Sequence, residues 1–236
     1  MEPQPFIIFG TSHLVTLAII LCLAIFFPRT YRDKSVSQKK NIAKILGISI
    51  IALELVKPFI WHSMDYPWIR LVPIHMCSLS GFFIGIFLLT KKRLFFEIAF
   101  FWGIGGGINA LITPDVTLTF PDPKYVLFFL GHGLLIVNIG YACIALRNRP
   151  TIKSVKNGIF FSLAVLPVIY IINLLLGPPA NYWYLGAKPT EGQSIMDFFP
   201  DPPLHIPLLI IIGAFLFLLI YSPYWVYDKF KKLNAE

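Results

Sequence analysis

The sequence predicts an all-α, polytopic membrane protein, a bundle of about seven transmembrane helices with its N-terminus outside and its C-terminus in the cytoplasm. Three observations support this prediction: the composition, the length of the apolar runs, and the distribution of Lys and Arg. Of the 236 residues, 56% are hydrophobic and only 14% are charged, which is more apolar surface than one water-soluble core could bury. The bilayer is therefore the expected solvent, and residues 1–236 are expected to form a single transmembrane domain.

Seven apolar runs approach the ~20 residues that a helix needs to cross a bilayer. The segment before the first run contains no Lys or Arg, unlike the start of a cleaved signal peptide, so this run is expected to stay in the protein as a helix. The predicted helices cover residues 6–27, 41–61, 71–90, 94–112, 125–146, 158–176 and 204–226. A long external loop, 177–203, precedes the last of them.

Helix breakers and charged clusters define the ends of these runs. From the first run to the last, the markers are Pro28 with Arg29, Pro67, the Lys91-Lys92-Arg93 triplet, the loop 114–123, Arg147, Gly177 and the lysines that follow Val226. Each predicted helix is therefore bounded by a local signal as well as by its length.

The orientation follows from the basic residues in the connections. Fifteen Lys and Arg residues fall in alternate connections and the C-terminal tail, against three, namely Arg70, Lys124 and Lys188, on the opposite side. The basic side of a multi-pass protein faces the cytoplasm. The cell membrane is therefore the expected location, and the C-terminus is expected inside.

The net charge of +8 is carried by short clusters between apolar runs, where Lys and Arg orient helices and meet anionic lipid headgroups. Membrane lipids are therefore the expected partners, and nucleic acid is not. The three cysteines, Cys22, Cys77 and Cys143, lie inside apolar runs, too few and too scattered for a disulfide framework or a Cys-rich zinc site. The sequence does not specify an oligomeric state.

Polar residues inside the apolar runs gather toward the external side. With ~1.5 Å of rise per residue, several lie roughly 10 Å below the outer helix ends and others lie nearer the surface. The deeper group is His13, Glu54, His75, Cys77 and His132, and the shallower group is Asn109, Asn173 and His205. Such residues are costly in a bilayer, so each is a candidate functional position.

Glu54 and Lys57 stand three residues apart on one face of the second predicted helix, where they can form a charge pair. The pair is either a structural link between helices or a device that positions a substrate headgroup or orients a histidine. Asn109 and Asn173 are further candidates for binding or orienting a substrate.

Cys77 lies in the part of the third predicted helix that carries the most side chains capable of chemistry. A thiol becomes a strong nucleophile when a base or a cation lowers its pKa. His75 is two residues away, roughly 200° around a regular helix, so it is a poor direct base. His132 is the better candidate by depth, and His13 is next. The alternative is that Cys77 is a small packing residue.

Two further features adjoin this layer. The fourth predicted helix carries Gly103, Gly105, Gly106 and Gly107, which permit close helix packing or a local break. The external loop 177–203 is rich in aromatic residues and proline, so it is either a lid over the polar layer or a passive cover at the interface.

Several patches resemble the YwaF-like family of bacterial integral membrane proteins, which is related to eukaryotic transmembrane protein 164. The matching pieces are Phe9-Gly10-Thr11 with His13, Pro73-Ile74-His75-Met76-Cys77-Ser78, Thr113-Pro114-Asp115, and Asn181-Tyr182 with Lys188-Pro189. The resemblance implies a multi-pass protein whose eukaryotic relatives are proposed acyltransferases of ether-phospholipid remodelling. It also implies that Cys77 is the nucleophile that accepts the acyl group.

The leading hypothesis is thus a membrane-embedded acyltransferase acting on phospholipid near the outer leaflet, without a metal or cofactor. A second enzyme hypothesis uses His75, His132 and either His13 or His205 as zinc ligands for lipid hydrolysis. A third, from another class, is a small-molecule transporter or a ligand-binding receptor. The scarcity of polar residues in the inner half favours a one-sided site, hence an enzyme or a binder.

Overall fold

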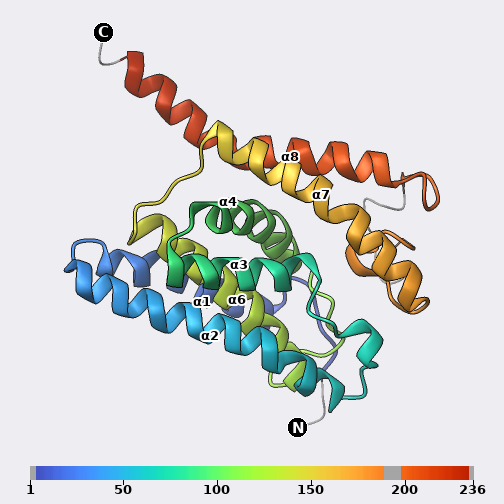
Figure 1. Cartoon of the computed structure of the whole chain (residues 1–236). Helices are drawn as coiled ribbons and strands as arrows, with labels where there is room; N and C mark the ends of the chain where they lie inside the picture. Colours follow the sequence, from blue (N-terminus) through green and yellow to red (C-terminus); the bar gives the residue numbers. More distant parts are fainter. Residues whose placement is uncertain (1–3, 189–197, 234–236) are drawn as a thin grey trace.

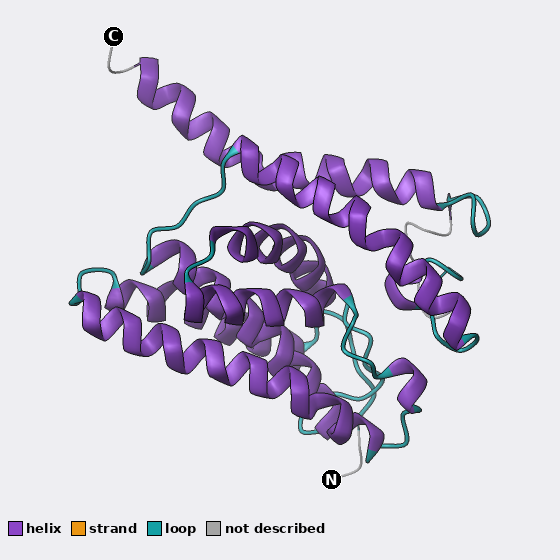
Figure 2. Cartoon of the chain, viewed as in Figure 1, coloured by secondary structure: helices purple, strands orange, loops and turns teal. Residues whose placement is uncertain are grey.

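The regular elements of the chain are helices (Figure 2). The computed structural model describes residues 4–188 and 198–233, and within these ranges it contains no β-strand, only an isolated bridge between Pro5 and Leu118. In chain order the elements are α1 (Thr11–Tyr31), α2 (Val36–His62), η1 (Trp68–Arg70), α3 (Met76–Thr90), α4 (Arg93–Trp102), the π-helix η2 (Gly103–Gly107), α5 (Ile108–Ile112), α6 (Pro123–Ile144), α7 (Ile152–Leu176), η3 (Tyr182–Tyr184) and α8 (Ile206–Leu233).

Within the described ranges, five helical segments are long and apolar enough to cross a membrane, namely Thr11–Tyr31, Arg93–Ile112, Pro123–Ile144, Ile152–Leu176 and Ile206–Lys231. The second of these joins α4, η2 and α5 into one span. Of the other two predicted spans, α2 carries Lys44, Glu54 and Lys57 within its apolar part, and α3 has only 15 residues. The all-helical membrane architecture is confirmed, while the number seven and the orientation stay predictions.

Several helix boundaries differ from the predicted ones, for local reasons. The first helix was predicted to end before Pro28, but α1 continues through it to Tyr31. The helices α2 and α7 begin earlier than predicted because the capping boxes Ser35–Gln38 and Thr151–Ser154 satisfy their first amides. The helix α3 begins at Met76 instead of Leu71, because the preceding segment contains Pro73 and hydrogen bonds to the external loop.

Small residues allow the helices to approach one another closely. A Cβ added at Gly47 of α2 would lie 2.9 Å from the backbone oxygen of Gly85 on α3, and one at Gly140 of α6 would clash with the backbone oxygen of Ala24 on α1. Pro28 has no N–H, so this oxygen lacks its usual hydrogen bond from the residue four positions later. The pairs α2–α3 and α1–α6 are therefore fixed by backbone contact as well as by side chains.

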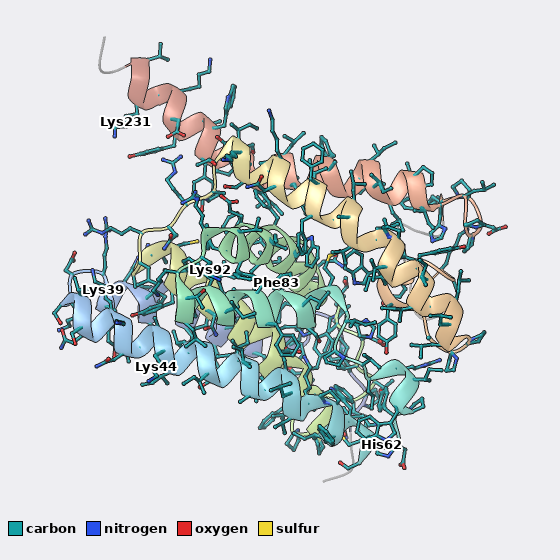
Figure 3. All side chains as sticks on the ribbon, in the orientation of Figure 1. Lys39, Lys44, His62, Phe83, Lys92 and Lys231 are labelled. Atoms are coloured by element: carbon teal, nitrogen blue, oxygen red, sulfur yellow. The ribbon has the colours of Figure 1, made fainter. Side chains whose placement is uncertain are left out.

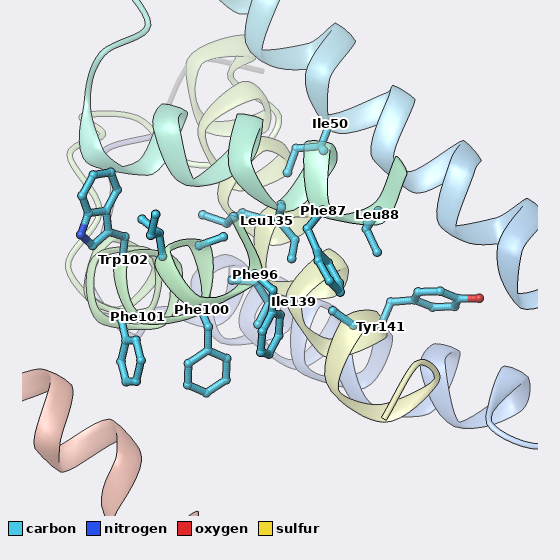
Figure 4. Packing of buried hydrophobic residues seen from close by; sticks show 14 of the residues in the cluster. Ile50, Phe87, Leu88, Phe96, Phe100, Phe101, Trp102, Leu135, Ile139 and Tyr141 are labelled. Carbon is cyan, nitrogen blue, oxygen red and sulfur yellow. The ribbon is translucent and has the colours of Figure 1, made fainter. Parts of the chain in front are cut away.

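The core lies around α4, in which every residue from Phe96 to Trp102 is buried. Phe87 of α3, Leu135 and Ile139 of α6, and Ile50 of α2 belong to the same cluster (Figure 4). The helices α7 and α8 run side by side along one flank of the bundle, and the C-terminal end of α8 extends past the other helices (Figure 1). The indole N–H of Trp102 donates to Ser162 Oγ at 2.8 Å, which links α7 to this core.

Candidate functional site

A buried ion pair on α2 is the first part of the site. Lys57 Nζ lies 2.7 Å from both carboxylate oxygens of Glu54, and the Glu54 side chain is only 3% exposed. A Cβ at Gly81 of α3 would lie 2.9 Å from Glu54 Cγ, and one at Gly131 of α6 would lie 3.6 Å from Lys57 Nζ. Two glycines thus make room for the predicted charge pair between α2, α3 and α6.

Cys77 occupies the first turn of α3, because that helix begins at Met76. Its half-buried thiol lies over the bare face of Gly106 in η2, where an added Cβ would be 3.5 Å from Sγ. The Glu54–Lys57 pair lies against Gly81, one turn farther along α3. Amides of a first helical turn have no partner within the helix and favour negative charge nearby. The thiol therefore combines a helix N-terminus, a nearby cation and a site where the opposite backbone carries no side chain.

His132 presents an unprotonated ring nitrogen. Its Nδ1–H donates to the backbone oxygen of Phe128 at 2.9 Å, which leaves Nε2 with a lone pair. In the described part of the chain Nε2 has no hydrogen-bond partner. Lys57 Nζ lies close to the preceding residue, Gly131, where an added Cβ would be 3.6 Å away. A neutral imidazole with a free Nε2 can accept a proton.

His13 is placed differently. It is 1% exposed, its Nδ1 accepts from the Phe9 amide at 3.0 Å, and its Nε2–H donates to the Leu111 backbone oxygen at 2.8 Å. The rings of Phe6, Phe9 and Phe129 surround it. Both nitrogens are thus engaged with backbone, which ties the start of α1 to α5.

Three further predicted residues, His75, Asn109 and Asn173, lie at or near helix ends. His75 immediately precedes α3, and its Nε2–H donates to Arg70 O at 3.3 Å. Asn173, at the end of α7, forms two hydrogen bonds with the Tyr182 backbone, at 2.8 and 2.9 Å. Asn109 is exposed on α5, and its side chain has no hydrogen bond within the described ranges. Asn173 therefore positions the external loop.

That loop packs on the segment before Cys77. The Tyr182 hydroxyl donates to Ile69 O at 2.8 Å and accepts from the Val72 amide, and the Trp183 indole donates to Ile74 O. Burial raises the pKa of Tyr182, which keeps the phenol protonated as a donor. Trp183 and Tyr184 have φ of 60° and 54°, strained values for aromatic residues.

Burial raises the pKa of Tyr184, and the charges of Asp115 and Cys77 raise it further. His205 is fully buried, and its Nε2–H donates to Tyr184 O at 2.8 Å. The His205 Nδ1 has no hydrogen-bond partner in the described residues. Residues 189–197 of the predicted loop 177–203 lie outside the described residues.

The zinc hypothesis is not supported by this geometry. Within residues 4–188 and 198–233, no group of three His, Cys, Asp or Glu side chains could hold a metal ion. His13 and His205 each direct Nε2–H at a backbone carbonyl, which leaves the histidines on separate helices without a common centre.

A second polar network lies at the opposite end of the helices and was missed by the sequence reasoning. Glu97 of α4 is 4% exposed. Its Oε1 accepts from Arg93 Nε at 2.9 Å and from Ser154 Oγ at 2.8 Å, and its Oε2 accepts from Asn157 Nδ2 at 2.7 Å. In the sequence, only the i, i+4 spacing of Arg93 and Glu97 signals a partner.

Gly81 and Gly131 are the other omission, because a glycine in an apolar run signals close packing without saying against which side chain.

Comparison with known proteins adds two findings. The model of the TMEM164 family matches residues 8–221. An uncharacterized protein of Treponema pallidum (strain Nichols) is 24% identical over 223 residues, covering 93% of this chain and 90% of that protein. No solved structure matches.

Proposed function

This chain belongs to the TMEM164 family, and we propose that it is a membrane-embedded lipid acyltransferase with Cys77 as its nucleophile. One observation carries the proposal: the Cys77 thiol lies in the first turn of α3, over the bare backbone of Gly106 in the π-helix. A π-helix within an α-helical span is itself frequent at functional sites.

The first half-reaction moves an acyl group onto the protein. His132 Nε2 takes the thiol proton, and the Cys77 sulfur attacks the carbonyl carbon of a phospholipid ester. The bond between that carbon and the ester oxygen breaks, and His132 returns the proton to the departing lysophospholipid. The products are a thioester on Cys77 and one lysophospholipid.

The second half-reaction regenerates the thiol. The hydroxyl of an acceptor lysophospholipid gives its proton to His132 and attacks the thioester carbon. The carbon–sulfur bond breaks, and the thiolate takes the proton back. The net change is transfer of one acyl chain between two lipids, with no external reductant, oxidant or metal.

The first turn of α3 supplies the groups that would stabilise the oxyanion. The amides of Cys77 and Ser78 belong to this turn and have no partner within the helix. Two preorganised amide donors are the usual means of holding the negative oxygen of a tetrahedral intermediate. The Glu54–Lys57 pair keeps a positive charge near the thiol without leaving a bare cation in the membrane.

This proposal requires the predicted topology. One domain, residues 1–236, crosses the cell membrane seven times, with α2 and α3 as spans in addition to the five apolar segments. The N-terminus is outside and the C-terminus is cytoplasmic. The first turn of α3 then faces the outer leaflet, where lipid headgroups reach Cys77.

A lipid-exchange assay tests the proposal. The purified protein is placed in vesicles of phosphatidylcholine with an isotope-labelled sn-2 chain, together with a lysophosphatidylethanolamine acceptor, and labelled phosphatidylethanolamine is measured by mass spectrometry. Cys77→Ala is expected to reduce transfer by roughly 10³-fold or more, because the covalent route is lost.

Cys143→Ala is the matched control, since Cys143 is a half-buried thiol on α6 packed against the core. It is expected to retain wild-type transfer. Transfer that survives Cys77→Ala, or a wild-type protein that forms no labelled product, contradicts the proposal.

A further inference from the structure

A basic cavity lies at the other end of α3 from Cys77. It has a volume of about 700 Å³ and lies between the start of α2, the end of α3 and the connection that follows α6. Five cationic side chains line it: Lys39, Lys40, Lys44, Lys91 and Arg147. Lys39 and Lys44 lie toward one end of α2, and His62 lies at the other (Figure 3). Neither the candidate site nor the proposed chemistry uses these residues.

The positive charge of this cavity is barely compensated. Arg147 pairs with Asp33 at 3.3 Å, and both side chains are exposed. In the described ranges, Lys40, Lys44 and Lys91 form no salt bridge. Burial lowers the pKa of Lys91, and the charge of Lys40 lowers it further. Like charges gathered in a concave site attract an anion that relieves their repulsion.

The cations are held on a fixed scaffold. Lys91 and Arg147, each just beyond the end of a helix, have φ of 60° and 56°, values that favour glycine. The buried Tyr141 hydroxyl donates to Lys39 O at 2.9 Å, which fixes α2 against α6. Arrangement of charged side chains on a rigid frame lowers the cost of binding.

The walls of the cavity are apolar. Leu88 is 2% and Ala145 0% exposed, and they belong to the core, whereas Leu89 and Val36 are 42% and 80% exposed at the edge. A free phosphate or a sugar would gain nothing from such walls, but an amphiphile would. In the predicted topology, the helix ends around the cavity lie where the membrane meets water.

We propose that the basic cavity binds the phosphate of an anionic phospholipid, with the first carbons of its acyl chains along Leu89 and Val36. Lys40, Lys91 and Arg147 contact the phosphate from three elements. Basic pockets between transmembrane helices on the cytoplasmic side are suited to such headgroups, and the volume falls in the range of ligand sites. This site is independent of Cys77, so either can fail without the other.

Native mass spectrometry of the full-length protein in neutral detergent tests this site. The probes are phosphatidylglycerol, phosphatidylcholine of the same chains, and inorganic phosphate. One phosphatidylglycerol is expected to bind at least about tenfold more tightly than phosphatidylcholine. The variant Lys40→Gln with Lys91→Gln is expected to lose about tenfold or more of that affinity, since each cation near a membrane surface contributes roughly fivefold.

Lys153→Gln with Lys156→Gln is the matched control, because both lysines are exposed on the first turns of α7 and do not line the cavity. It is expected to change affinity by less than about twofold. If the double variant in the cavity does not fold, the single variants Lys40→Gln and Lys91→Gln each test the same claim at roughly fivefold.

Equal binding of the two lipids, or an equal loss in the control, overturns the proposal. Inorganic phosphate that displaces phosphatidylglycerol at millimolar concentration overturns the assignment to a lipid.

Discussion

Among the residues that the structure describes, two carboxylates are buried, Glu54 and Glu97, and their surroundings differ. Glu97 accepts three hydrogen bonds from α4 and α7, and each of its oxygens is used. Glu54 has a single partner, Lys57, whose ammonium lies at 2.7 Å from both oxygens. Around Glu97 the donors also hold the fold together, because Ser154 belongs to the capping box of α7 and Arg93 donates to Arg149 O at 2.9 Å. The Glu54–Lys57 pair instead lies against Gly81, one turn beyond Cys77, and Gly131, next to His132.

The difference distinguishes a structural network, around Glu97, from a candidate reactive site, around Glu54. A fully satisfied buried network rigidifies the fold and offers no group to a substrate. The Glu54 region instead keeps a thiol and a free imidazole nitrogen beside glycines that leave space. A transporter would need available polar groups at both ends of its path, and the inner network is committed to the protein itself. This comparison favours a one-sided site.

The largest effect is expected from His132→Gln. Loss of the base should lower acyl transfer by about 10²–10⁴-fold in the exchange assay, while the unfolding midpoint changes little, because the ring makes only one hydrogen bond. His13→Gln is the comparison, since both nitrogens of His13 bind backbone. It should lower the midpoint and leave transfer per folded molecule unchanged. The reverse pattern would make His13 the base.

Glu97→Ala should act on stability alone. It leaves Arg93, Ser154 and Asn157 without their carboxylate, and loss of one member of a buried charged network costs about 3–5 kcal/mol. Because Arg93 is half exposed, the lower end of that range is expected. Thermal unfolding in detergent measures the loss. If transfer per folded molecule falls as well, the inner network is not merely structural.

Glu54→Gln should affect both properties, because Lys57 loses its counter-charge in a buried position. We expect about 1–3 kcal/mol of destabilisation together with slower transfer. Adding Lys57→Gln removes the uncompensated charge, so the double variant should regain stability but not transfer. A double-mutant cycle on midpoints and rates separates the two contributions. If the double variant regained both stability and transfer, the Glu54–Lys57 pair would serve only to link helices.

Gly106→Ala should give the smallest effect. An added Cβ lies at 3.5 Å from Cys77 Sγ, an ordinary contact, and Ala favours a helix over Gly by about 1 kcal/mol. Stability should hold or rise, while transfer slows a few-fold as the methyl group narrows access to the thiol. Gly107→Ala, which would contact Leu135 and Ile136 instead, should not slow transfer. Equal rates for both variants would remove Gly106 from the site.

The sequence could predict most helices because apolar length and charge are local properties. It could not place the start of α3, since the Tyr182 hydroxyl that bonds the Ile69 and Val72 backbone comes from a loop more than a hundred residues later. The π-helix was also out of reach, because the glycines of 103–107 permit several geometries and tertiary packing selects one.

Within the candidate site, the pairing of Glu54 with Lys57 could be predicted from their spacing, and that prediction is confirmed. The roles of His13 and Asn173 were not visible, because whether a polar side chain bonds to backbone depends on which helix ends approach it. His132 stood out only by depth; its free Nε2 depends on the Phe128 carbonyl one turn earlier.

The most direct test of the account is to trap the thioester. The purified protein is incubated with labelled phosphatidylcholine in the absence of an acceptor and then digested and analysed by mass spectrometry. The account predicts one labelled acyl chain on the peptide containing Cys77, removed by neutral hydroxylamine and absent from Cys77→Ala. Lipid exchange without any acyl group on Cys77, or acylation of Cys22 and Cys143 to the same extent, would contradict it.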